Sequence, residues 1–168
     1  EKVDEAVYFA ALVSSKKKLS YTYSVEKVNG EVIEYSDPYA FENVTKADSY
    51  KAFLAGEEMN AAGIFGAHER IVNGVSGVLF TAWAPKALSV SVVGEFNKYD
   101  GRIHIIQRIE DTGEFELVLP GLEADCEYMY EIKKQGSGTV RKLDALSRKF
   151  NTRHVTDSVV CDEKALGS

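Results

Sequence analysis

Cysteine and long apolar runs are both scarce in this chain. Two cysteines occur among 168 residues, Cys126 and Cys161, and they form neither a CxxC motif nor a zinc-ligand spacing. We therefore expect buried free thiols and a cytoplasmic protein. No run of about 18 apolar residues is present, and the first residues lack the basic-then-apolar pattern of a signal peptide. The sequence thus predicts no membrane partner.

Basic residues and histidines are also few. Lysine and arginine number 20 against 26 acidic residues, which gives a net charge of -6. Neutralising nucleic-acid phosphates requires a basic face, so this balance argues against a nucleic-acid partner and suits a neutral ligand such as a sugar. The three histidines, His68, His104 and His154, lie far apart without ligand spacing. We therefore predict no metal site and no cofactor.

Short alternating stretches of β-branched and aromatic residues are what the sequence does contain. From Glu69 onward they are separated by turn dipeptides such as Asn73-Gly74 and Asp100-Gly101. About seven short strands at a spacing of roughly ten residues are typical of an immunoglobulin-like β-sandwich. We therefore predict an all-β fold, with residues 69–162 as the sandwich and residues 163–168 as a tail.

A smaller β unit is expected ahead of the sandwich. Asn29-Gly30 is a strong hairpin signal, and the apolar residues 7–13 predict an earlier strand. Because a sheet of two or three strands is marginal alone in water, residues 1–41 read as a partial β module.

A linker is expected between the two β units, over residues 42–68. Apolar residues at helical spacing predict a short helix within residues 45–60, with Gly56 ending or interrupting it. Residues 63–68 then read as an extended entry into the sandwich.

Several short motifs carry a resemblance to a known family. They are, in order, Asp-Pro-Tyr-Ala-Phe at 37–41, Gly-Ala-His at 66–68, Trp-Ala-Pro at 83–85, Gly-Glu-Phe-Asn at 94–97, Glu-Tyr-Met-Tyr-Glu-Ile at 127–132 and Lys-Leu-Asp at 142–144. Their order and spacing resemble the N-terminal part of bacterial 1,4-α-glucan (glycogen) branching enzymes. The third and fourth motifs alone are similar to the wider class of glycogen-binding modules, which includes the β subunit of AMP-activated kinase.

The resemblance implies a non-catalytic role for this chain. In the family, two β-sandwich modules precede a catalytic (β/α)8 barrel, and the whole enzyme is a glycosyltransferase that forms α-1,6 branches in glycogen. Its retaining mechanism needs two carboxylates roughly 5 Å apart. A barrel takes about 250 residues by itself, so we assign no catalytic residue here. The implied partners are α-1,4-glucan or glycogen and the barrel of the same polypeptide, and the missing initial methionine suggests a piece of a longer protein.

The candidate carbohydrate-binding residues lie at the C-terminal end of the Gly-Glu-Phe-Asn motif and directly after it. They are Tyr99, Asn97, Lys98 and Arg102. In the kinase-subunit relatives, a Trp at the position of Tyr99 stacks on glucose and a Lys stands at the position of Met129. The smaller aromatic and the lost donor would weaken such a site. Alternatively, Tyr99 covers the edge of the core, and Asn97 serves its own turn.

A second set of residues is expected at the contact with the barrel. It consists of Trp83, His68, Lys142 and Asp144. Trp83 lies within a strand just before Pro85, where core or interdomain packing is favoured over sugar stacking. Lys142 and Asp144 could instead form a structural pair.

Three functions remain open on the sequence alone. The first is the N-terminal, glucan-docking and barrel-bracing part of a branching enzyme. The second is a structural interaction module without sugar affinity. The third is a glycogen-targeting module of a non-enzymatic subunit.

Overall fold

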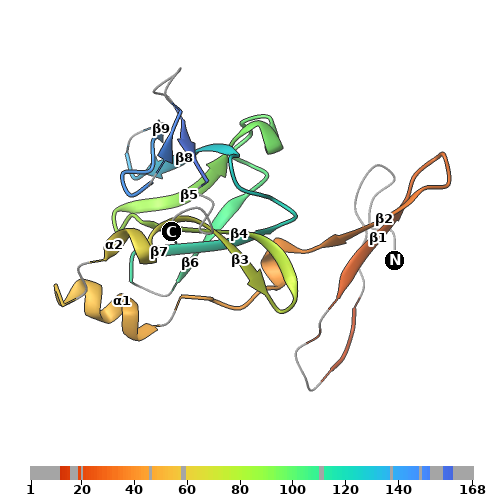
Figure 1. The fold of residues 1–168 in the computed structure, drawn as a ribbon, viewed down its shortest axis with the longest axis horizontal. Helices are drawn as coiled ribbons and strands as arrows, with labels where there is room; N and C mark the ends of the chain where they lie inside the picture. Colours follow the sequence, from red (N-terminus) through yellow and green to blue (C-terminus); the bar gives the residue numbers. More distant parts are fainter. Residues whose placement is uncertain are drawn as a thin grey trace, which may run out of the picture. The chain divides into compact units, whose positions relative to one another are not determined.

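The computed structural model describes residues 12–15, 19, 21–45, 47–57, 60–109, 112–136, 138–147, 149–151 and 157–160. The chain divides into two compact units, residues 1–36 and residues 37–168. Figure 1 shows the elements of both units. Among the described residues, no helix is long and apolar enough to cross a membrane.

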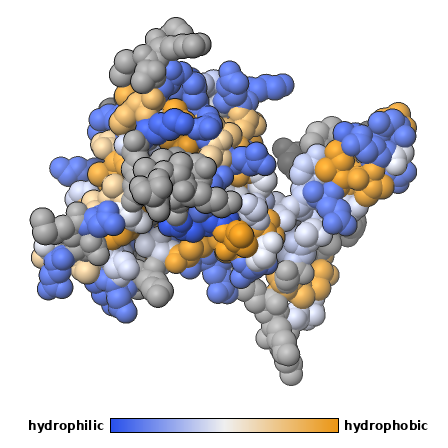
Figure 2. Space-filling view, in the orientation of Figure 1, coloured by the Kyte–Doolittle hydropathy of each residue, from blue (hydrophilic) through white to orange (hydrophobic). Residues whose placement is uncertain are grey.

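The first unit contains an antiparallel hairpin of β1 (Thr22–Glu26) and β2 (Val32–Ser36). Gly30 takes a positive φ of 82° in the connecting loop, which explains why an Asn-Gly pair suits this position. The Asn29 side chain accepts a hydrogen bond from the backbone N–H of Glu31 at 3.1 Å. The predicted hairpin is thus present, whereas most of the expected strand over residues 7–13 lies outside the described residues. Apolar side chains lie on the hairpin's surface (Figure 2).

The segment before the sandwich contains three short helices. These are the 3-10 helix η1 (Pro38–Ala40), α1 (Ala47–Leu54) and α2 (Ala61–Ile64). The expected helix within residues 45–60 is therefore shorter, and Gly56, with a φ of 74°, follows its end. The prediction of extended backbone from residue 63 was wrong for residues 63 and 64, because the N–H of Phe65 closes a helical turn onto the carbonyl of Ala61.

The second unit is built mainly of antiparallel strands. They are β3 (Gly66–Val72), β4 (Val75–Trp83), β5 (Ala87–Val93), β6 (Ile105–Ile109), β7 (Glu114–Pro120), β8 (Glu127–Lys134), β9 (Thr139–Lys142), β10 (Lys149–Phe150) and β11 (Ser158–Val159). They pair in the order β10-β11-β8-β5-β6-β7-β4-β3, with β9 added beside β8. The strands form one curled sheet, which confirms the predicted all-β, immunoglobulin-like fold.

The core follows from the two-residue period of the strands. On β4, Val78 and Phe80 point inward, and on β7 Phe115 does the same. Tyr128 and Tyr130 on β8 face them, and the Tyr128 ring lies edge-on to Phe80 with 5.2 Å between centroids. Cys126 is a free, half-buried thiol packed against this core, while Cys161 lies outside the described residues.

The outer face of β4 and β7 is covered by the segment that contains the short helices. The Glu116 carboxylate accepts hydrogen bonds from the backbone N–H groups of Val44 and Thr45, the latter at 2.9 Å. The Tyr50 hydroxyl donates to the Thr112 carbonyl at 2.5 Å. This segment and the sandwich belong to one compact unit. The boundaries expected at residues 41, 68 and 162 stay predictions.

Candidate functional site

The turn between β5 and β6 brings together the residues predicted to bind carbohydrate. It begins with the 3-10 helix η2 (Glu95–Asn97) and continues through Lys98 and Tyr99, whose φ angles are 55° and 57°. The N–H of Tyr99 donates to the Gly94 carbonyl at 2.9 Å. Two successive non-glycine residues in the left-handed region are uncommon, and their backbone conformation turns the chain sharply.

Asn97 organises this turn from inside. Its side chain is only 3% exposed. The side-chain carbonyl accepts from the Gly94 N–H at 3.0 Å, and the side-chain amide donates to the Val92 carbonyl at 2.9 Å and to His104 Nδ1 at 3.0 Å. With both ends of the amide engaged and buried, Asn97 has no group directed at a ligand. It supports the site by holding the turn, the alternative role expected from the sequence.

Tyr99 lies at the surface of the turn in a half-buried position. Its hydroxyl donates to Asp157 Oδ2 at 3.4 Å, and its backbone carbonyl accepts from the Arg141 guanidinium at 2.8 Å. Burial raises the pKa of Tyr99, and the carboxylates of Asp157 and Glu127 add to this. Arg141 therefore holds the Tyr99 backbone, and the hydroxyl end of the ring has a longer hydrogen bond to Asp157.

The two cations of the predicted site differ in how free they are. Lys98 is exposed. The side chain of Arg102 is 90% exposed, but its guanidinium lies against Asp100, with 2.9 Å between Nε and Oδ1. These hydrogen bonds from Arg102 lower the pKa of Asp100 to about 2. Arg102 and Asp100 therefore offset each other's charge, while Lys98 remains an exposed cation.

Two residues that the sequence did not single out complete this turn. Arg141 on β9 reaches the Tyr99 carbonyl and also donates to Glu131 Oε2 at 3.0 Å. Asp157 holds the Tyr99 hydroxyl. Both lie more than 40 residues away in the chain, at 42 and 58 positions from Tyr99. Local sequence carries no signal for them.

His68 and Asp144, predicted at the barrel contact, are internal to the sandwich. They are 3% and 6% exposed. Asp144 accepts from the Tyr128 hydroxyl at 2.7 Å and from the Leu146 N–H at 2.9 Å. Burial raises the pKa of Asp144, whereas these two hydrogen bonds lower it. His68 Nε2 lies 3.0 Å from the Phe65 carbonyl oxygen. Both side chains are therefore buried and hydrogen-bonded inside the sandwich and do not lie on an exposed contact surface.

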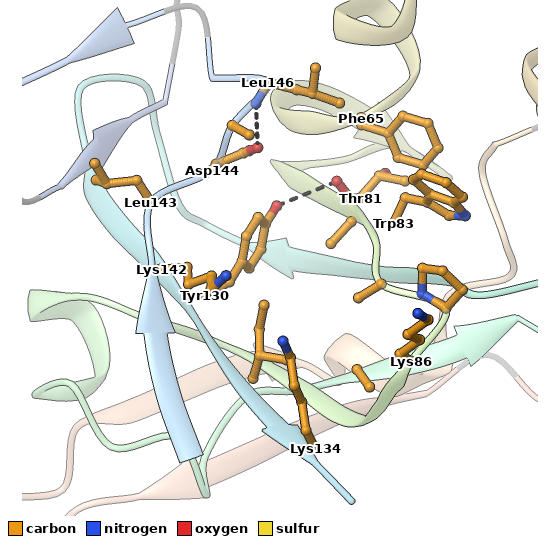
Figure 3. Close-up of a pocket in the computed structure, with 16 residues that line it drawn as sticks. Phe65, Thr81, Trp83, Lys86, Tyr130, Lys134, Lys142, Leu143, Asp144 and Leu146 are labelled. Carbon is orange, nitrogen blue, oxygen red and sulfur yellow. Dashed lines mark hydrogen bonds between the residues drawn. The ribbon is translucent and has the colours of Figure 1, made fainter. Parts of the chain in front are cut away.

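Trp83 and Lys142, from the same predicted set, are exposed at the mouth of a cavity. The cavity has a volume of about 410 Å³. Trp83 is 47% exposed, and its ring lies edge-on to that of Phe53 with 5.5 Å between centroids. In Figure 3, Trp83 and Phe65 lie together on one side, and Lys142 lies across from them. Asp144 lines the same cavity from within.

The chain has counterparts among known proteins. The sequence model of carbohydrate-binding module 48 (isoamylase N-terminal domain) matches residues 64–147, and the chain belongs to this family.

Relatives that match over most of the chain include bacterial enzymes. The chain is 38% identical over 148 residues to the 1,4-alpha-glucan branching enzyme GlgB of Nitrosococcus oceani, covering 86% of this chain and 20% of that protein. It is 34% identical over 166 residues to GlgB of Rhizobium meliloti, covering 98% and 22%. The resemblance to bacterial branching enzymes is thus confirmed. The chain spans about a fifth of the length of these relatives.

A solved structure is also similar to this chain. It is the pullulanase from Bacillus acidopullulyticus, at 21% identity and a TM-score of 0.45, with 60% of this chain and 12% of that chain covered.

Proposed function

We propose that this chain is the non-catalytic N-terminal part of a 1,4-alpha-glucan branching enzyme and that it docks α-1,4-glucan or glycogen. Its membership of a carbohydrate-binding module family supports the sugar ligand. The names of its relatives support the enzyme. Both favour this function over a structural module without sugar affinity.

The observation that carries the proposal is the Tyr99 ring, fixed on a surface turn. Its hydroxyl end and backbone are held by Asp157 and Arg141. An aromatic ring that is already ordered loses little conformational entropy when a glucose ring stacks on it. Lys98 supplies exposed donors beside the ring, and Arg102 keeps N–H groups beyond those used by Asp100.

Tyr99→Ala tests the glucan site by calorimetric titration with maltoheptaose. We expect the affinity to fall to background while the melting temperature of the second unit changes little. Tyr99→Phe should retain binding, because it keeps the ring and removes only the weak hydroxyl contact. The matched control is Tyr35→Ala, which removes a half-exposed tyrosine from β2. If wild type shows no binding at millimolar maltoheptaose, the docking proposal fails.

A second role, bracing the catalytic barrel, rests on the exposure of Trp83 and Lys142. His68 and Asp144 would act indirectly, by holding the surface that Trp83 belongs to. In a polypeptide containing both parts, Trp83→Ala should lower the melting temperature of the barrel. An unchanged barrel transition would remove this role and leave glucan docking intact. We place the protein in the cytoplasm, without a nucleic-acid or membrane partner, on its cysteine content and net charge.

A further inference from the structure

The cavity beside Trp83 runs along β5 and β8, and its Trp83 side is the part farther from the Tyr99 turn. Ala87, at the start of β5, lines the cavity, whereas Val93, at the end of β5, leads into the turn. The Tyr130 and Lys142 side of the cavity lies closer to the turn, because Lys142 pairs with Tyr130 and Tyr130 with Val92. Six residue steps along a strand span about 20 Å. A monosaccharide lying against Trp83 therefore does not reach the Tyr99 turn, and the ligand of the cavity has to be argued separately.

Unpaired cations surround this cavity. Lys86, Lys134 and Lys142 are exposed and line it. In the described part of the chain, none of their ammonium groups has an ion pair or a side-chain hydrogen bond. Figure 3 shows Lys86 and Lys134 along one edge and Lys142 across from Trp83. Three exposed lysines thus line one cavity of a protein whose net charge is -6.

No carboxylate in the cavity wall neutralises these lysines. Asp144 is the acidic side chain among the described lining residues, and it is buried. Its two oxygens accept from Tyr128 and from the Leu146 N–H. The side chains at the mouth therefore present donors and positive charge. A neutral glucan would also need acceptors for its hydroxyl protons, whereas a phosphate group offers acceptors and negative charge.

The rest of the wall is apolar and aromatic. Trp83, Phe65 and Pro85 form one side, and Leu143 and Leu146 form part of the other. The volume of the cavity, about 410 Å³, is in the range of small-molecule sites. A sugar ring lying against Trp83 would place an attached phosphate toward the lysines. A protein segment placed on Trp83 would require no such group of cations.

We infer that this cavity binds a phosphorylated sugar, with the ring against Trp83 and the phosphate between Lys86, Lys134 and Lys142. The site is separate from the proposed glucan site, so either can fail without the other. It shares Trp83 with the bracing role, but it is tested on this chain alone.

The single tryptophan makes the test direct. Trp83 is the chain's only tryptophan, so its fluorescence reports on this cavity and not on Tyr99. We expect glucose 1-phosphate to change the Trp83 emission with a saturating dependence, and raised salt to weaken the binding. Inorganic phosphate should bind more weakly, and maltose should produce no saturating change. The inference is overturned if glucose 1-phosphate has no effect at millimolar concentration, or if maltose acts equally well.

Two neighbouring lysines on β8 provide a matched pair of variants. Lys134 lines the cavity, whereas Lys133 does not line it and lies on the alternate face of the strand. Losing a charge-assisted hydrogen bond should weaken glucose 1-phosphate binding about tenfold in Lys134→Ala. Lys133→Ala removes the same charge and should leave the affinity unchanged. Equal effects of the two variants would mean a non-specific charge effect and would overturn the assigned site.

Discussion

Beside the Tyr99 turn the arginines are paired, and around the Trp83 cavity the lysines are not. Beside the Tyr99 turn, Arg102 lies on Asp100 and Arg141 lies on Glu131. Around the Trp83 cavity, Lys134 and Lys142 have no such partner in the described residues. Paired charges leave a nearly neutral surface with a fixed shape, which suits a neutral sugar. Unpaired charges leave a potential that attracts an anion. The same small fold can therefore present two chemically different surfaces.

The largest expected effect comes from breaking the support beneath the cavity. Asp144→Ala leaves the Tyr128 hydroxyl and the Leu146 N–H without their acceptor. Removing one side of a buried hydrogen-bonded group costs about 3 kcal/mol. Denaturant unfolding of the second unit should show a loss of that size. Asp144→Asn, which keeps one acceptor oxygen, should lose less. Equal stability of the alanine variant and wild type would contradict this role.

The next effect comes from breaking the support beneath the Tyr99 turn. Asn97→Ala removes the hydrogen bonds to the Gly94 N–H, the Val92 carbonyl and His104. A loss of about 2 kcal/mol in unfolding free energy is expected for these buried groups. Maltoheptaose binding should fall as well, because Tyr99 loses its fixed position. Lys98→Ala, an exposed neighbour, serves as the stability control. If Asn97→Ala is as stable as wild type and binds glucan normally, the turn does not support a glucan site.

The Tyr99 turn and the Trp83 cavity also differ in how well the sequence predicts them. The Tyr99 turn is a local structure: Asn97 and Tyr99 both form hydrogen bonds with Gly94, within six residues of chain. The Gly-Glu-Phe-Asn motif therefore predicts the position of the turn. The motif does not predict that Asn97 is buried, because this burial depends on the approach of His104 and β5.

The cavity, by contrast, is assembled from distant segments. Phe65, Trp83, Lys134 and Leu146 come from four separate parts of the chain and meet through strand pairing. Sequence reasoning singled out Trp83 and Lys142 as contacts with the barrel without revealing the hollow between them. The alternation of apolar residues was sufficient to predict the sandwich, because each strand shows this alternation in its own residues. Cavity shape depends on the register between strands, which the alternation does not specify.

On the outer face beside Trp83, a buried carboxylate is expected to make the stability of the protein depend on pH. Glu114, opposite Trp83 on β7, is 3% exposed, and its Oε1 has no partner among the described residues. Burial, with Glu116 adding to it, raises the pKa of Glu114 from 4.5 to about 7. Between these values the folded state holds a proton that the unfolded state releases. Stability is therefore expected to fall as the pH rises from 4.5 toward 7.

Denaturant unfolding at a series of pH values measures this slope. Glu114→Gln mimics the protonated carboxyl and should flatten it, with the largest gain over wild type at the alkaline end. The control is Glu69→Gln, a carboxylate on β3 whose Oε1 accepts from the Ala124 N–H at 2.8 Å. If Glu114→Gln and wild type keep the same slope, the titrating group lies elsewhere.

The smallest effect on stability is expected at the paired arginine. Arg102→Ala removes an exposed guanidinium from Asp100, and exposed ion pairs contribute little to folding because solvent screens them. The unfolding transition should therefore stay within experimental error of wild type. Glucan binding gives the informative readout: a lower affinity with unchanged melting would place Arg102 in contact with the sugar. An unchanged affinity would assign Arg102 to fixing Asp100 alone, and the proposed sugar contacts would reduce to Tyr99 and Lys98.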